Sequence, residues 1–156
     1  MNNAAKITGL LGNCNVLTMS GYKPIAELEA GERIITRNGL RVLRELSVTT
    51  HTFRAITVGR GTLGYSRPTS EMKVAPDQEV MVRDWRAEVL FGRDAVIIPI
   101  ARMVDGKYIS EEDAVSDHSV YELRFDGEEV FYADGVEIVS KLTVASVDTL
   151  DFADAA

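Results

Sequence analysis

Few residues in this chain are able to act as nucleophiles, proton carriers or metal ligands. The sequence has one cysteine, Cys14, and two histidines, His51 and His118. A cysteine attacks a carbonyl carbon as its thiolate, and a free cysteine is also among the residue types most often buried. Two roles are therefore open for Cys14: a nucleophile, or a small apolar side chain packed in the first strand. A single cysteine excludes an internal disulfide and a multi-cysteine zinc site.

The other polar candidates also have simple structural explanations. Gln78 is either an amide donor that polarises a peptide bond or an ordinary turn residue, and Asp77 is expected to organise that turn through its side chain. Both histidines have polar neighbours and are expected to be solvated, so we predict no metal site and no cofactor. The carboxylate run at 111–113 lacks the glycine spacing of a calcium loop, which favours a solvated loop.

A repeated segment indicates how these residues are positioned. Residues 24–34 read PIAELEAGERI and residues 99–109 read PIARMVDGKYI, so Pro, Ile, Ala, an apolar residue, Gly and Ile recur at the same offsets. In each copy the proline suits the first position of a short helix and the glycine suits its end. Two unrelated turns are one explanation. The other is a duplicated unit that folds with internal two-fold pseudo-symmetry.

Short strands separated by turn residues predict an all-β domain with only short helical turns. We expect a type I′ hairpin at Asn38-Gly39 and a hairpin turn at Asp126-Gly127, with positive φ at both glycines, and a further turn at Asp134-Gly135. The last two turns belong to a predicted meander over residues 119–142. The strands on either side of Pro76 form a hairpin or a corner. Residues 85–92 form one or two helical turns, with Trp85 as a core or hairpin-anchoring side chain.

Composition and charge narrow the classes of function. The 156 residues carry a net charge of −7, whereas nucleic acids and anionic membranes bind positively charged surfaces. No apolar run approaches the roughly 20 residues of a membrane-spanning helix, and residues 1–13 are too polar for a signal peptide. We therefore expect a cytoplasmic monomer with no nucleic-acid or membrane partner, and with a protein partner that the sequence does not name. Non-classical secretion stays open because of the acidic C-terminal residues.

Four blocks of sequence together resemble the Hint (hedgehog/intein) domain in its bacterial, intein-like form. They are NCNVLTMSG with PIAEL and GERIITRNG (13–39), VAPDQEVMV (74–82), WRAEVLFG with IP and VDG (85–106), and YELRFD through VFYADG (121–135). The resemblance implies a β fold with a pseudo-two-fold axis and descent from domains that cleave or splice their own backbone. It predicts a Hint-like domain over residues 9–142, between a flexible segment 1–8 and an acidic tail 143–156.

The chemistry of the family implies three groups that this sequence replaces. The resemblance requires a Cys or Ser as the first residue of the domain, but a gapless match places that position on Gly9 and puts Cys14 where a Thr is usual. It requires a histidine that acts on the scissile amide, but that position holds Gln78. Two later positions that often hold histidine read Glu122 and Glu128. Splicing also needs a C-terminal Asn, and no Asn follows residue 38.

Two hypotheses follow from this comparison. In the first, the domain is catalytically silent and acts as a non-catalytic module, with Cys14, Asp77 and Gln78 as the remnant of the family site and Gly9 at the nucleophile position. In the second, it is an active intein-like domain that cleaves the chain before Cys14 by an N–S acyl shift. Both predict that residues 76–78 approach residues 9–14.

Overall fold

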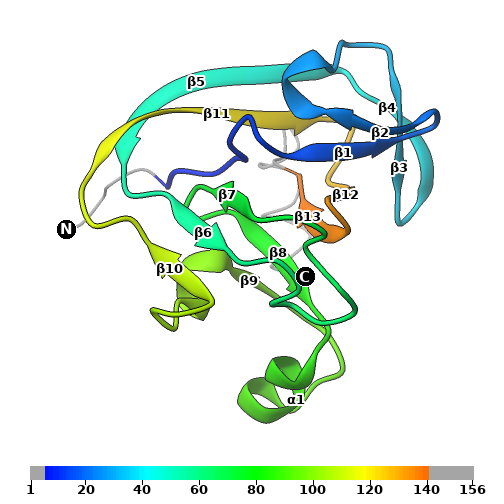
Figure 1. Ribbon diagram of the computed structural model, residues 1–156. Coiled ribbons are helices and arrows are strands. Elements are labelled where there is room, and N and C mark those ends of the chain that lie inside the picture. Colours follow the sequence, from blue (N-terminus) through cyan, green and yellow to red (C-terminus); the bar gives the residue numbers. More distant parts are fainter. Residues whose placement is uncertain (1–5, 141–156) are drawn as a thin grey trace, which may run out of the picture.

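The computed structural model describes residues 6–140, and these residues form an almost entirely β structure (Figure 1). Residues 1–5 of the predicted flexible start lie outside this range. So does the whole of the predicted acidic tail, residues 143–156. The strands are β1 (Asn15–Thr18), β2 (Gly21–Pro24), β3 (Arg33–Thr36), β4 (Gly39–Val42), β5 (Glu45–Phe53), β6 (Ile56–Val58), β7 (Met72–Val74), β8 (Glu79–Val82), β9 (Val96–Pro99), β10 (Ile109–Glu111), β11 (Ser116–Arg124), β12 (Val130–Ala133) and β13 (Val136–Val139). The helical elements are the 3₁₀ turns η1 (Ile25–Glu27) and η2 (Ile100–Met103) and the helix α1 (Trp85–Phe91).

Within residues 6–140 the strands pair into three sheets. The largest has the order β2-β1-β3-β12-β13-β8-β9, with β4 paired to β3. The second has the order β10-β6-β7, and the third is a ribbon of β5 and β11 that arches over the top of the view in Figure 1. All nine residues of β5 pair with the nine of β11. The predicted all-β fold with short helical turns is confirmed.

The two halves of the chain have matching element orders and share several strand pairings, as the repeat predicts. β3 pairs with β12 as β10 pairs with β6, β6 pairs with β7 as β12 pairs with β13, and the β5–β11 ribbon joins the halves. Before η1 and η2, Pro24 and Pro99 have φ/ψ of −54/135° and −63/138°. Gly31 and Gly106 both have positive φ. The repeated sequence therefore follows a repeated backbone path.

The repeated apolar residues are in the core. Ile25 and Ile100, which begin the two 3₁₀ turns, are each at most 1% exposed, and so are Ile34 and Ile109 at the ends of the repeats. Burying a side chain of this size contributes roughly 1.5–3 kcal/mol of transfer free energy. The duplicated Pro-Ile and Gly-x-x-Ile patterns thus mark the positions where each half anchors to the shared core.

The hairpins β1–β2 and β3–β4 have the same turn, although its type differs from the prediction. Thr18 Oγ1 donates to the Gly21 carbonyl and Thr36 Oγ1 to the Gly39 carbonyl, each at 2.7 Å. Both glycines have positive φ, but Asn38 does not. A hairpin at Asn38-Gly39 is therefore confirmed, whereas a type I′ turn, which needs positive φ at both central residues, is wrong. The threonine hydroxyl closes the turn instead.

The hairpin predicted at Asp126-Gly127 is wrong. β11 pairs with β5, while β12 pairs with β13, β3 and β1, so the residues between Arg124 and Val130 connect different sheets. Gly127 has no positive φ. A local turn signal does not reveal the long-range partner of a nine-residue strand. The turn at Asp134-Gly135 is confirmed, with φ of 50° and 86°.

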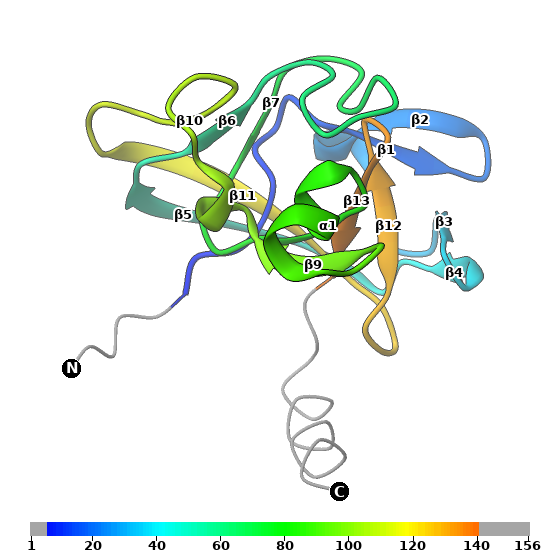
Figure 2. The same ribbon diagram turned by 90° about the horizontal axis from the view of Figure 1, so that it is seen from below.

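The chain at Pro76 forms a corner, the second of the two predicted alternatives, because β7 pairs with β6 and β8 pairs with β13 and β9. Residues 85–91 form the helix α1, which begins at the Asp84 cap and ends at Gly92 in a left-handed conformation. The helix projects from one end of the molecule (Figures 1 and 2), and Trp85 is 61% exposed. Its prediction as a core or hairpin-anchoring aromatic is wrong, because its helix stands out from the sheet.

Replacing Gly39 with alanine tests the turn geometry. We expect Gly39→Ala to lower the free energy of unfolding by on the order of 1 kcal/mol, because its φ of 89° is unfavourable for a residue with a Cβ. Gly127→Ala is the matched control. Gly127 has no positive φ, and an added Cβ would meet nothing within 4 Å. Urea denaturation of both variants gives the comparison, and equal midpoints would contradict the assignment.

Candidate functional site

Residues 7–11 run as an extended segment between β7 and β11. Leu10 donates to the Tyr121 carbonyl at 2.9 Å and accepts from the Tyr121 N–H at 2.8 Å. On the other side, Leu11 donates to the Lys73 carbonyl, and Ala75 donates to the Gly9 carbonyl, both at 3.0 Å. The segment that contains Gly9, the predicted nucleophile position, is therefore integrated into the β structure on both sides.

The corner at Asp77 and Gln78 holds the start of this segment. The Ile7 N–H donates to Asp77 Oδ2 at 2.8 Å, and the Asp77 N–H donates to the Ile7 carbonyl at 3.0 Å. The Gly9 N–H donates to Gln78 Oε1 at 2.9 Å. The predicted approach of residues 76–78 to residues 9–14 is confirmed at Gly9, and Asp77 bonds to Ile7.

The surroundings of Gln78 fix the orientation of its amide. Nε2 lies 2.8 Å from the Val139 carbonyl and 2.9 Å from the Glu79 carbonyl. Since carbonyl oxygens only accept, these two partners place the NH₂ group there and turn Oε1 toward the Gly9 N–H. The side chain is 5% exposed. In this orientation Gln78 accepts a hydrogen bond from the peptide nitrogen that joins Thr8 to Gly9, and it has no proton to transfer to that nitrogen.

The backbone at Gly9 leaves no room for a side chain. Its φ is 124°, and an added Cβ would lie 3.0 Å from Val120 Cβ and 3.1 Å from the Tyr121 carbonyl oxygen. Both the conformation and the contacts therefore oppose any larger residue at this position. A cysteine or serine nucleophile does not fit here without movement of β11.

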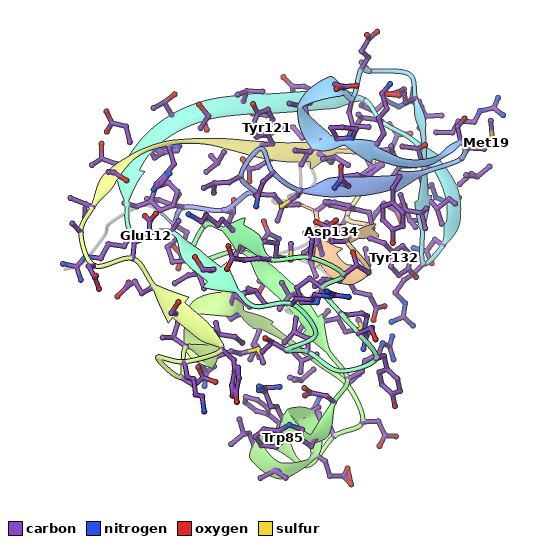
Figure 3. The ribbon with its side chains drawn as sticks, viewed as in Figure 1. Met19, Trp85, Glu112, Tyr121, Tyr132 and Asp134 are labelled. Carbon is purple, nitrogen blue, oxygen red and sulfur yellow. The ribbon has the colours of Figure 1, made fainter. Side chains whose placement is uncertain are left out.

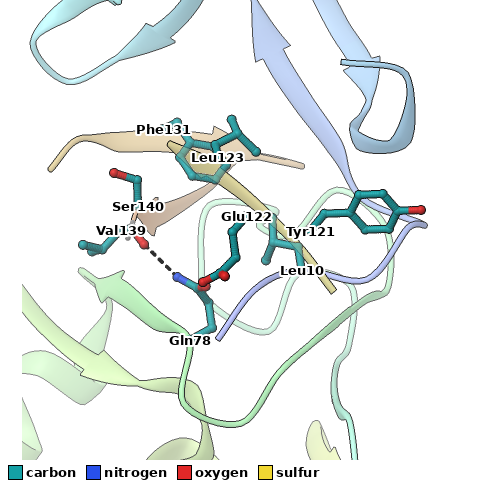
Figure 4. A pocket seen from close by; sticks show the side chains of 8 residues that line it. All are labelled: Leu10, Gln78, Tyr121, Glu122, Leu123, Phe131, Val139 and Ser140. Carbon is teal, nitrogen blue, oxygen red and sulfur yellow. Dashed lines mark hydrogen bonds between the residues drawn. The ribbon is translucent and has the colours of Figure 1, made fainter. Parts of the chain in front are cut away.

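Thr8 and Glu122 form the remaining polar contact of the site. The Thr8 hydroxyl donates to Glu122 Oε2, and Arg124 Nη2 lies 3.8 Å from Glu122 Oε1. Figure 4 shows the Glu122 side chain directed toward Gln78, beside a cavity of only about 10 Å³. That volume holds about one water molecule at most. The cluster is a closed polar contact between segments and has no space for a substrate.

Cys14 lies apart from this cluster. Its Sγ is 3.8 Å from the Lys73 carbonyl and 3.8 Å from Asn13 Oδ1, and the residue is fully buried. Burial, and after it the negative charge of Asp134, raise the pKa of the thiol to about 12. This environment is the one expected of a packed apolar side chain, and it opposes ionisation of a nucleophile.

The two histidines differ from each other. His51 is exposed, as predicted. The prediction for His118 is wrong, because its ring packs against Phe53 in a tilted arrangement with the centroids 4.9 Å apart, and its Nε2 lies 2.8 Å from Glu112 Oε1. The Ala55 N–H, and to a lesser degree His118, lower the pKa of the Glu112 carboxyl. His118 and Glu112 thus tie β11 to the connection after β10, while no cluster of residues 6–140 has the ligands to hold a metal ion.

The family model for the Hint domain matches residues 8–144 of the sequence. The chain belongs to the Hint domain family. No curated protein sequence matches it. No helix within residues 6–140 is long and apolar enough to span a membrane.

Solved Hint structures share its fold at low sequence identity. The DnaB intein from Synechocystis sp. PCC 6803 matches with a TM-score of 0.59 at 12% identity, over 86% of this chain and 99% of that one. The gp41-1 intein matches with a TM-score of 0.54 at 11% identity, over 85% and 98%. A bacterial intein-like domain from Clostridium thermocellum matches with a TM-score of 0.51 at 18% identity, over 88% and 100%. At these identities the likeness concerns the fold alone.

Sequence reasoning found part of this cluster and missed part of it. It identified Gly9, Asp77 and Gln78, which the structure brings together, and Cys14, which the structure places elsewhere. It named Glu122 only as a replaced histidine and did not single out Thr8. The position of Thr8 immediately before the nucleophile position was a usable signal. Glu128 is exposed in the connection between β11 and β12.

Substitution of Gly9 tests the steric closure of the site. We expect Gly9→Ala to reduce the free energy of unfolding by about 2 kcal/mol or more, because strain at positive φ adds to overpacking against β11. Gly12→Ala is the control three residues away, where φ is not positive and the nearest contact of an added Cβ is 3.4 Å. Chemical denaturation measures both variants. A Gly9→Ala variant as stable as Gly12→Ala would show that the site is open.

Proposed function

We propose that this domain is a catalytically silent member of the Hint family, in which the former cleavage site has become a structural contact. The observation that carries the proposal is the pairing of Gly9 with Gln78. The nucleophile position has no side chain and no space for one. The position of the histidine holds an amide that accepts from the peptide N–H.

The loss of proton transfer supports this proposal. Cleavage of a peptide bond by acyl transfer requires a group that protonates the departing amine, and such help is typically worth about 10²–10⁴-fold in rate. Gln78 does not titrate near pH 7 and directs Oε1, an acceptor, at the nitrogen. Glu122 is engaged by the Thr8 hydroxyl and lies near Arg124. The buried groups around the Thr8–Gly9 peptide hold it in place.

The alternative function, cleavage before Cys14 by an N–S acyl shift, has less support. Burial raises the pKa of the Cys14 thiol to about 12, so the thiol is protonated near neutral pH. The Sγ atom contacts the Lys73 carbonyl, and the Cys14 backbone carbonyl accepts from Ile25 N–H in the β1–β2 unit. Asp77 and Gln78, the other proposed remnants of the site, act on residues 7–9 instead.

As a non-catalytic module, the domain would act by binding another polypeptide. The net charge of −7 favours a protein partner over nucleic acid. We place the chain in the cytoplasm as a monomer, where its one buried thiol stays reduced. These assignments rest on charge and on the single cysteine.

Intact mass spectrometry tests whether the domain cleaves its own chain. We expect purified protein to keep its full-length mass, apart from loss of Met1, after a day with or without dithiothreitol. The physical reason is that no thiol lies at the Thr8–Gly9 peptide and that the Cys14 thiol is protonated and buried.

Two kinds of fragment would overturn the proposal. A fragment that begins at Cys14, and disappears in Cys14→Ala, would restore the second hypothesis. A fragment that begins at Thr8 or Gly9, and disappears in Glu122→Gln, would show that the polar cluster around Gln78 still cleaves the chain.

A further inference from the structure

The strand β9 leaves one edge of the large sheet open. It is the last strand in the order of that sheet and, in the described part of the chain, pairs with β8 alone. The Ile100 N–H donates to the Gln78 carbonyl at 2.9 Å, and hydrogen-bonded positions alternate along an antiparallel pair. Ile98 and Val96 therefore direct their backbone groups to β8, whereas Ile97 directs its N–H and C=O away from the sheet. An edge of this kind accepts a further strand.

A hollow of about 370 Å³ lies along this edge. It is lined by Met81, Arg93, Ala95, Val96 and Ile97. Ile97 is 43% exposed, and the small side chain of Ala95 leaves space beside it. Arg93 is the charged residue of the lining, and its exposed side chain forms no hydrogen bond or ion pair with another residue of the described chain. The lining therefore offers an unpaired guanidinium and no carboxylate.

The face of the sheet beside the hollow carries more positive than negative charge. Glu137 of β13 is 4% exposed, and its carboxylate oxygens lie 2.5–3.7 Å from the guanidinium groups of Arg37, Arg67 and Arg83. One carboxylate balances one of these three groups, so an excess of positive charge remains. Arg37 Nη1 and Arg83 Nη2 also lie 2.8 and 3.0 Å from Met81 Sδ, which is a weak acceptor. Through Met81 the arginine cluster borders the hollow.

The other carboxylates near β9 do not cancel this charge. Glu79 and Asp94 are exposed, and neither lines the hollow. Exposed charges are screened by salt and water more than buried ones are. Asp84 is ion-paired with Arg86. An unpaired guanidinium next to a cluster of three arginines on one glutamate therefore selects an anionic occupant.

This surface is separate from the cluster around Gln78. Side chains alternate between the two faces along a strand, so Met81 points away from the face of Gln78, three residues before it. Figure 3 shows Tyr132, the partner of Glu137 in the β12–β13 pairing, apart from Tyr121, which lines the small cavity beside Gln78. The charge on the open edge is therefore not part of the Hint site.

We propose that the edge of β9 binds an extended acidic segment of another polypeptide as an added strand. The backbone of the segment pairs with Ile97, and every second side chain lies on the face of Met81, where a carboxylate meets the guanidinium of Arg93. The alternate side chains lie beside Val96, which is half-buried, so apolar residues suit those positions. This inference rests on the proposed role of the domain as a binding module, and it does not depend on whether the domain cleaves itself.

Fluorescence anisotropy with two labelled peptides tests the charge preference. The probe is a fluorescein-labelled peptide of alternating Glu and Val, and the control peptide has Gln in place of each Glu. We expect the full-length protein to bind the Glu peptide more tightly by about tenfold or more. Arg93→Glu should weaken this binding by about tenfold or more. Arg33→Glu, the same charge change at an exposed residue of β3, four strands away in the sheet order, should leave it unchanged.

A proline at residue 97 tests whether the bound segment pairs with the backbone. Proline removes the outward N–H of Ile97 and no hydrogen bond to β8, and edge strands tolerate proline at such positions. We expect Ile97→Pro to abolish binding of the Glu peptide, and Ile97→Val, which keeps the N–H, to retain it. Far-UV circular dichroism and urea denaturation confirm that each variant is folded.

Four results would overturn the proposal. They are failure of the full-length protein to bind the Glu peptide, equal affinity for the two peptides, unchanged binding in Arg93→Glu, and unchanged binding in a folded Ile97→Pro. A dimer that forms with rising protein concentration in analytical ultracentrifugation, and dissociates in Ile97→Pro, would assign the edge to a second copy and also overturn it. Cleavage fragments in the mass spectrum would instead contradict the silence of the domain and leave peptide binding unaffected.

Discussion

The hydrogen bond from the Gly9 N–H to Gln78 Oε1 joins three parts of the chain that are distant in sequence. The Gln78 Nε2 donates to the Val139 carbonyl at the end of β13 and to the carbonyl of its neighbour Glu79. These two hydrogen bonds fix the amide so that its oxygen, Oε1, faces the Gly9 N–H. The entering segment 7–11 then completes the pairing between β7 and β11. A buried polar group left without a partner costs about 1–3 kcal/mol. Truncation of Gln78 to alanine would remove the side-chain partner of the Gly9 N–H and of the Glu79 and Val139 carbonyls together.

The pseudo-symmetry explains why Cys14 is buried. Cys14 precedes β1 as Gln78 precedes β8, and their backbone carbonyls accept from Ile25 and Ile100, each at 2.9 Å. The two residues therefore occupy equivalent positions at the start of the two halves, and both are buried. In the first half this position holds the small side chain of Cys14. In the second half it holds the amide of Gln78, which binds Gly9 of the entering segment. The burial of the thiol follows from this place in the fold.

Local sequence patterns predicted the short strands and most of the turns. They did not predict which distant strands pair with one another. The repeat of Pro, Ile and Gly in residues 24–34 and 99–109 predicted two equivalent turns, because these residue types impose similar local geometry in both copies. The partner of β11 was not predictable from Asp126-Gly127, since strand pairing depends on packing across the whole domain. At the site, the alignment of Gly9 and Gln78 identified the contact, but the closure around Gly9 depends on Val120 and Tyr121, which no local signal connects to it. The exposure of Trp85 likewise depends on how far its helix stands from the sheet.

Amide hydrogen exchange at Gly9, measured by NMR on the full-length protein, tests most directly whether the Thr8–Gly9 peptide is held as a structural contact by Gln78. A donor bonded to a buried Gln78 in a segment paired on both sides exchanges only when the domain opens extensively. We expect the Gly9 amide to be protected to the same degree as the amides of the core strands β12 and β13. Exchange as fast as that of an unstructured peptide would contradict the assignment, because it would show that the Thr8–Gly9 peptide is released from Gln78 in the native protein.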